Sequence, residues 1–193
     1  RLNFVAPDFQ MPDGGLNIRL VDDRIEQEAR LVDYKRYAAE AFANANKMDK
    51  RVWGKPGAKI GFVAAGKNWL DLVHALSLLN IDASEAERLG VTTYKVGQTW
   101  PLDTKTFNQW AEGLDVIVVV EEKRKLIEVQ IKEAIFDNRA GRRVYGGMKE
   151  GDVFFSAKWA LDPVEIASKL GQVLIDEGRN TDGIQAGMAT LDE

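Results

Sequence analysis

Three short apolar runs recur along the chain, and each is followed by a polar loop and then by a segment of helical period. The runs cover residues 59–65, 91–96 and 115–120. Their apolar length and the turn residues around them predict buried β-strands. Strands that alternate with helices are typical of a parallel sheet with right-handed crossovers. The pattern therefore predicts a domain of the α/β class.

The polar loops after these runs carry the candidate chemistry. They are Gly66-Lys67-Asn68, residues 97–101 and residues 121–124. In a parallel sheet, the loops that leave the carboxyl ends of the strands gather at one edge, where ligands and partners bind. We expect any functional site to lie there.

The remaining pattern suggests three parts: an N-terminal arm with a long helix (1–56), an α/β domain (57–178) and a polar, frayed tail (179–193). Asp23 with Glu26 forms a capping box, which predicts a helix to about residue 47. A Gly-Lys-Pro-Gly break precedes the first strand. The alternative, in which the long helix packs on the sheet as part of the same domain, stays open.

Further elements follow the same signals. Asp103 and Asp162 are predicted helix caps, the second with a proline at the first helical position. The run 115–120 is the most apolar, so we expect it centrally in the sheet, buried on both faces. Residues 143–146 and 153–157 are candidate strands, with a hairpin at the sheet edge as one arrangement.

Composition excludes several classes of function. The 193 residues carry a net charge of −4, which favours neither nucleic acid nor an anionic membrane as partner. No apolar run approaches the roughly 20 residues that span a bilayer. The absence of cysteine excludes disulfides, thiolate zinc sites and iron–sulfur ligation in these residues. A cytoplasmic location is expected, and the first residue, Arg1, suggests a piece of a longer protein.

Two motifs have ordinary structural interpretations. Gly61 to Lys67 has the Gly-x4-Gly-Lys spacing of a phosphate loop, but Asn68 stands where Ser or Thr should bind magnesium. We interpret Gly66 as a strand-to-helix turn, after which a helix N-terminus could receive an anion. His74, the one histidine, has no catalytic partner beside it, and we expect it to be packed or on the surface. No metal-ligand spacing occurs.

The charged and aromatic loop residues allow two interpretations each. Glu121 and Glu122 precede a predicted helix, where carboxylates interact favourably with the helix dipole. The four charges 121–124 would equally suit an interface or a ligand clamp. Trp100 is either folded under its loop or docked on another domain.

Several phrases, taken in order, resemble a known family. They are residues 14–19, the segment 60–71, Tyr-Lys-Val-Gly-Gln-Thr-Trp-Pro-Leu at 94–102, and Val-Val-Glu-Glu-Lys-Arg at 119–124 continuing to Glu128. Up to about Gly146 the chain resembles the middle domain of the fused indolepyruvate ferredoxin oxidoreductases, which belong with the thiamine-diphosphate-dependent 2-oxoacid:ferredoxin oxidoreductases.

The resemblance implies a three-layer α/β/α fold with a mainly parallel, five-stranded sheet, as in the transketolase C-terminal domain. The whole enzyme would oxidatively decarboxylate a 2-oxoacid to an acyl-CoA and reduce ferredoxin. The Gly-Asp-Gly…Asn diphosphate–magnesium motif and the cluster cysteines are absent here. Thiamine diphosphate, magnesium and iron–sulfur clusters are therefore expected on other parts of the parent, and no catalytic residue carries over.

The implied role is supportive: the strand-end edge would pack against the thiamine-binding domains. The expected contacts are Lys67, Trp100, Glu121, Glu122, Lys123 and Arg124. A second possibility is that Lys67, Lys123 and Arg124 hold the phosphates of coenzyme A. Expected partners are the other domains of the polypeptide, a second copy in a homodimer, and ferredoxin. The competing hypothesis is a free-standing flavodoxin-like module that binds a nucleotide or anion at the same edge.

Overall fold

The computed structural model describes residues 3–191. The α-helices are α1 (Arg24–Arg30), α2 (Arg36–Ala45), α3 (Gly66–Leu78), α4 (Ala83–Arg88), α5 (Thr104–Ala111), α6 (Ile127–Ile135), α7 (Pro163–Asp176) and α8 (Asp182–Thr190). The strands are β1 (Lys50–Arg51), β2 (Ile60–Ala65), β3 (Val91–Val96), β4 (Val116–Val120), β5 (Arg143–Tyr145), β6 (Met148–Lys149) and β7 (Asp152–Val153).

Five strands form the main sheet in the order β1-β3-β2-β4-β5. The pairs β2–β3, β2–β4 and β4–β5 are parallel, and β1 is antiparallel to β3. This confirms the predicted α/β fold with a mainly parallel, five-stranded sheet. Every residue of β4 is buried, as expected for an interior strand. The centre of the sheet, however, is β2, because β5 adds a further strand outside β4.

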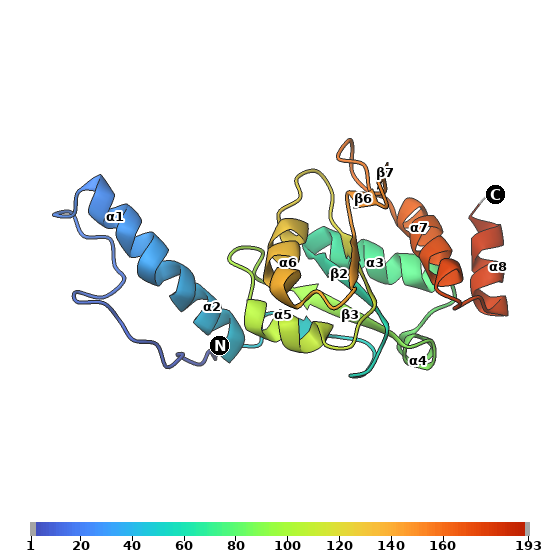
Figure 1. The fold of residues 1–193 in the computed structure, drawn as a ribbon, viewed down its shortest axis with the longest axis horizontal. Helices are drawn as coiled ribbons and strands as arrows, with labels where there is room; N and C mark the ends of the chain where they lie inside the picture. The colour runs from blue at the N-terminus through green and yellow to red at the C-terminus, as the bar shows by residue number, and fades with distance from the viewer. Residues whose placement is uncertain (1–2, 192–193) are drawn as a thin grey trace.

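Helices cover both faces of the sheet (Figure 1). On one face, α3 and α7 pack on the β2 side chains Ile60, Phe62 and Ala64. On the other, α5 and α6 pack on Val63 and on Tyr94 of β3. The alternation of side chains along a strand produces these two cores, because successive residues point to opposite faces. The predicted caps are present: the Asp103 carboxylate accepts from Thr106 N, and Asp162 accepts from the first turn of α7.

The N-terminal part projects from the sheet as an elongated arm (Figure 1). Asp23 caps α1 as predicted, and one π-helical turn, Leu31–Lys35, joins α1 to α2. The extended segment before α1 runs back along this helix and is held at both ends. Asn46 exchanges two hydrogen bonds of 2.8 Å with the Val5 backbone, and Arg30 donates to Gly15 O at 2.7 Å.

The arm leaves apolar side chains uncovered. Four of them are more than three quarters exposed: Ile18, Leu20, Val21 and Ile25. Large apolar side chains exposed close together in the sequence favour association with other surfaces. We therefore expect the isolated chain to self-associate as its concentration rises, and we expect Leu20→Ser with Val21→Ser to reduce that association. Sedimentation velocity measures both, and a monomer at all concentrations would contradict the expectation.

Three elements differ from the sequence predictions. Residues 179–193 were expected to be a frayed tail, but α8 forms there, with Ile184 fully buried. The strand predicted at 153–157 is shorter: only Val153 is extended, in the hairpin β6–β7, because Phe154 and Phe155 turn into the core. Finally, β1 lies before residue 57, on the arm side of the expected boundary, yet it pairs with β3.

Candidate functional site

The carboxyl ends of β2, β3 and β4 lie side by side because the strands are parallel and in register. Ala65 is paired with Val96, and Ala64 with Val120. The loops that follow therefore leave from neighbouring positions, as the sequence predicted. We call the three segments that follow these strands the carboxyl edge: residues 66–68, which form the first turn of α3, and the loops 97–101 and 121–124.

Lys67 is held in a network that ties three segments together. Its ammonium lies 2.9 Å from the Asp71 carboxylate and 3.6 Å from Glu122 Oε2, and it donates to Leu161 O at 2.7 Å. Glu122 Oε2 also accepts from Leu161 N at 3.1 Å. The contact with the Asp71 carboxylate raises the pKa of Lys67. The network fixes the loop after β4 to the segment before α7.

Glu121 occupies the N-terminus of α6. Its carboxylate accepts from the backbone N–H groups of Leu126, Ile127 and Glu128, at 2.9–3.1 Å. These groups have no partner inside the helix, so the carboxylate acts as a cap and also interacts favourably with the helix dipole. The structure thus agrees with the capping interpretation of Glu121, while the interface role expected for it stays a prediction.

Lys123 and Arg124 are exposed at the tip of the same loop. Neither forms an ion pair within residues 3–191. Lys123 adopts a left-handed backbone, φ 61°, which turns the chain between β4 and α6. Of the three cations considered for coenzyme A phosphates, these two are the ones whose charge is not already paired.

Trp100 is 52% exposed, although the loop that carries it is held firmly. The Gln130 side chain on α6 donates to Thr99 O at 2.9 Å and accepts from Leu102 N at 2.9 Å. Gln98 donates to Pro101 O at 2.8 Å. The indole is therefore presented to solvent from an ordered backbone and is not folded under its loop.

Lys67 and Trp100, at the two ends of the carboxyl edge, lie beside helices that cover opposite faces of the sheet. Lys67 lies in the first turn of α3, which packs on the face shared with α7. Trp100 lies beside Gln130 of α6, on the face covered by α5 and α6. The structure thus brings Lys67 together with Glu122, and Trp100 with α6.

Asp49 supports the Trp100 loop, and the sequence analysis missed it. Its Oδ1 accepts from Gly97 N at 2.7 Å and from Gln98 N at 2.9 Å, and the residue is 1% exposed. Its Oδ2 and the Tyr94 hydroxyl are buried without hydrogen-bond partners in the described chain. Burial raises the pKa of Asp49. No local motif marks this residue, because its partners are 48 or 49 positions away.

Glu128 is a second supporting residue near the carboxyl edge that the sequence did not single out. Its Oε2 accepts from Gly147 N at 2.7 Å, and Lys132 donates to its Oε1 at 2.5 Å. The carboxylate anchors the loop that leaves β5, so a fourth strand end is fixed to α6. In the sequence, Glu128 was marked only as the last residue of the segment 119–128 that resembles the family.

Two other sequence interpretations are consistent with the structure. Gly66 is the first residue of α3, with φ 53°, so the chain turns directly from β2 into the helix without a phosphate-type loop. His74 is exposed on α3 and makes no side-chain hydrogen bond within residues 3–191. It is a surface histidine.

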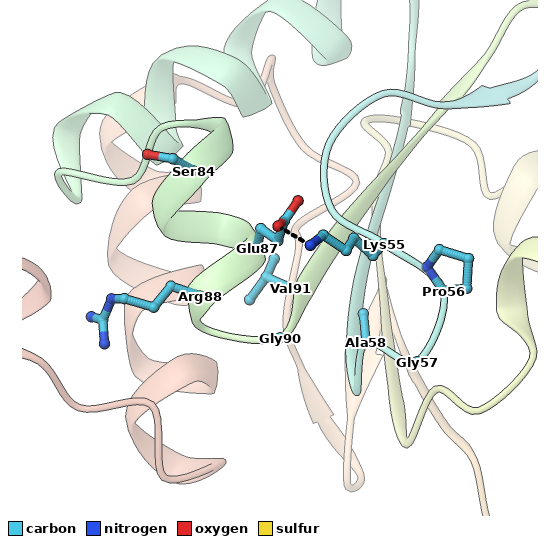
Figure 2. A pocket seen from close by; sticks show the side chains of 9 residues that line it. All are labelled: Lys55, Pro56, Gly57, Ala58, Ser84, Glu87, Arg88, Gly90 and Val91. Carbon is cyan, nitrogen blue, oxygen red and sulfur yellow. Dashed lines mark ion pairs between the residues drawn. The ribbon is translucent and has the colours of Figure 1, made fainter.

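The opposite, amino edge of the sheet has a hollow of about 370 Å³ that the sequence analysis did not anticipate (Figure 2). Lys55 reaches across it to form an ion pair with Glu87 of α4. Arg88 points away and pairs with Glu85 at 2.6 Å. Because Lys55 and Arg88 are both ion-paired, this hollow offers a ligand no unpaired cation from the described residues, whereas the carboxyl edge offers Lys123 and Arg124.

Residues 3–191 contain no group of three or more His, Cys, Asp or Glu side chains placed to hold a metal ion. No helix there is long and apolar enough to cross a membrane.

Comparison with known sequences identifies the family. The model of the family described as the indolepyruvate oxidoreductase domain matches residues 50–193. The chain belongs to the indolepyruvate oxidoreductase family. This confirms the resemblance, and the match begins at β1, so it includes the antiparallel strand that precedes the expected boundary.

Curated relatives of the indolepyruvate oxidoreductase domain are far longer than this chain. Indolepyruvate oxidoreductase subunit IorA of Pyrococcus horikoshii is 29% identical over 93 residues, which are 48% of this chain and 13% of IorA. The subunits of Pyrococcus abyssi and Thermococcus kodakarensis are 27% and 26% identical over the same length. The chain thus matches about one eighth of each relative.

Solved structures with similar chains include an inactive β4 tetramer of a split-gene transketolase, at 16% identity and a TM-score of 0.45, covering 65% of this chain and 41% of that one. A 2-oxoglutarate:ferredoxin oxidoreductase from Magnetococcus marinus is 13% identical, with a TM-score of 0.46, covering 77% of this chain and 21% of that one.

Proposed function

We propose that this domain is part of a 2-oxoacid:ferredoxin oxidoreductase that acts on indolepyruvate, and that it supports the assembly of the thiamine-binding domains without contributing a catalytic residue. The parent would decarboxylate the 2-oxoacid oxidatively, form an acyl-CoA and reduce ferredoxin, and it would act as a homodimer. The family match supports the enzyme class. The support for an interface comes from the carboxyl edge.

The cofactors of such an enzyme do not fit the residues of this chain. The sequence has no cysteine for an iron–sulfur cluster. Among residues 3–191 no set of carboxylates and histidine converges on a metal position. We therefore derive no chemical step on this domain and assign thiamine diphosphate, magnesium and the clusters to other parts of the parent.

One observation carries the proposal: Trp100, Lys123 and Arg124 are exposed, yet their loops are held by buried or paired groups. Ordering a side chain or loop costs free energy at the moment of binding, and a loop that is already ordered avoids that cost. Tryptophan and arginine are also the residues most enriched among those that dominate interface energies. The carboxyl edge thus has the features of a preformed docking surface.

Charge reversal in the full-length enzyme tests this role. We expect Lys123→Glu with Arg124→Glu to weaken assembly and turnover about tenfold, the effect of about 1.4 kcal/mol. Arg24→Glu with Arg139→Glu is the matched control, because both residues lie away from the carboxyl edge, are exposed and form no ion pair within residues 3–191; it should have little effect on either. Subunit assembly by sedimentation and turnover by ferredoxin reduction are the measurements.

Glu121 and Glu122 are less suitable targets, because one caps α6 and the other binds Leu161 N. Replacing either carboxylate would remove hydrogen bonds that hold the loop 121–124 in place, so a loss of assembly could not be assigned to a lost contact with a partner. Equal activity and assembly in the Lys123/Arg124 variant and the control would contradict the proposal.

A further inference from the structure

A groove lies between α2, the Trp100 loop and α6, on the outer side of the carboxyl edge. Its first hollow, of about 300 Å³, is lined by aromatic and charged side chains from all three segments. A second hollow, of about 380 Å³, adjoins it and shares Tyr37 and Glu40. We call the two together the α2 groove.

The walls of the α2 groove include two exposed aromatic rings on fixed supports. Trp100 is 52% exposed and Tyr37 is 48% exposed. Gln98 links the two supports, because its side chain donates both to Ala39 O of α2, at 3.2 Å, and to Pro101 O, at 2.8 Å. Asn44 of α2 donates in turn to Thr106 Oγ1 at 2.8 Å. The backbone segments that carry the two rings are therefore fixed relative to each other.

The charged lining of the α2 groove is mainly negative. Glu40 and Glu133 line the first hollow, and Asp8 and Asp103 line the second. Neither Glu40 nor Glu133 forms an ion pair with any residue in the described range. Burial raises the pKa of Glu40 and the Asp103 charge adds to the effect, whereas the Arg36 charge lowers it in part.

The α2 groove is lined by two cations, Arg36 and Lys105, which are fewer than its four carboxylates. Arg36 lies over the Tyr37 ring, 4.7 Å from its centroid, and donates to the Tyr37 hydroxyl at 2.7 Å. Lys105 lines the second hollow. A partner group that is both cationic and flat would contact the rings and neutralise the carboxylates together, since guanidinium groups stack on aromatic faces and pair with carboxylates.

We propose that the α2 groove receives an arginine side chain from another protein segment of the enzyme, stacked on Trp100 and paired with Glu40 and Glu133. This proposal rests on the proposed function of the carboxyl edge as an interface. It adds the chemical identity of the group that docks beside Trp100. Phosphates and other anions are disfavoured by the same carboxylates. The groove is thus distinct from the Lys123–Arg124 tip, which suits an acidic partner.

The test uses this chain, labelled with ¹⁵N, and the peptide acetyl-Gly-Arg-Gly-amide as probe. We expect a saturable shift of the Trp100 indole N–H signal, which is assigned by its loss in Trp100→Phe. The same peptide with citrulline, which keeps the shape without the charge, should bind at least about fivefold more weakly. Benzoate probes for an aromatic anion.

Glu40→Gln with Glu133→Gln should weaken binding of the arginine peptide about fivefold, whereas Glu28→Gln on α1, which is exposed and outside the groove, should not. Equal binding of the citrulline peptide, binding of benzoate in place of the arginine peptide, or no shift at Trp100 would each overturn the proposal. None of these outcomes depends on the assembly of the full-length enzyme. A failure here is thereby separable from a failure of the Lys123/Arg124 experiment.

Discussion

Replacing Ile184 by alanine is expected to lower the free energy of unfolding by about 2–5 kcal/mol. Ile184 lies on α8, is fully buried and belongs to the core cluster formed with α3 and α7. Truncation removes apolar contacts and leaves a cavity that the packed helices cannot readily fill. Urea unfolding followed by circular dichroism measures the change.

The neighbouring Gln185 supplies the control for this experiment, because it is exposed on the same helix. Gln185→Ala should change stability by no more than about 0.5 kcal/mol. If Ile184→Ala were as mild as its control, α8 would not be packed on the domain, and the frayed tail expected from the sequence would be the better description.

The second large effect is expected at Asp49. Asp49→Ala leaves the N–H groups of Gly97 and Gln98 without their acceptor, which should cost about 1–3 kcal/mol. Because these bonds fix the start of the Trp100 loop, hydrogen exchange of both amides should become faster. Thermal unfolding and exchange measured by NMR test the two effects, and unchanged exchange would contradict the supporting role of Asp49.

Asp49→Asn separates the hydrogen bonds from the charge. The amide keeps an oxygen acceptor but cannot ionise. We expect this variant to be at least as stable as the wild type at pH 7, since burial disfavours the charged carboxylate.

The pH dependence follows from the direction of the pKa shift. Burial raises the folded-state pKa of Asp49 above its ordinary value of 3.8. As the pH falls through the raised value, the folded state takes up a proton before the unfolded state does, so this carboxyl favours folding increasingly down to about pH 3.8. The wild type should therefore gain stability relative to Asp49→Asn on acidification. A constant difference from pH 7 to pH 4 would show that the Asp49 pKa is not raised.

The groups at the carboxyl edge were partly predictable. That the loops after three strands would meet followed from the βα alternation, because parallel strands place their carboxyl ends together. The sequence pattern did not predict that Lys67 pairs with Glu122 and donates to Leu161 O. These partners lie 55 and 94 positions away in the sequence. Asp49 and Glu128 were missed for the same reason: each looks like any acidic residue until its distant partner is known.

The sequence by itself determined the elements whose signals are local. The strands β2, β3 and β4, the caps Asp23, Asp103 and Asp162, and the family all follow from runs, spacings and phrases within a few residues of one another. Only the tertiary structure decided the rest. The strand β1 has two residues, and α8 has nine, two of which are glycine. Such segments are marginal alone. The strand β1 forms because β3 pairs with it, and α8 forms because Ile184 packs into the core with α3 and α7.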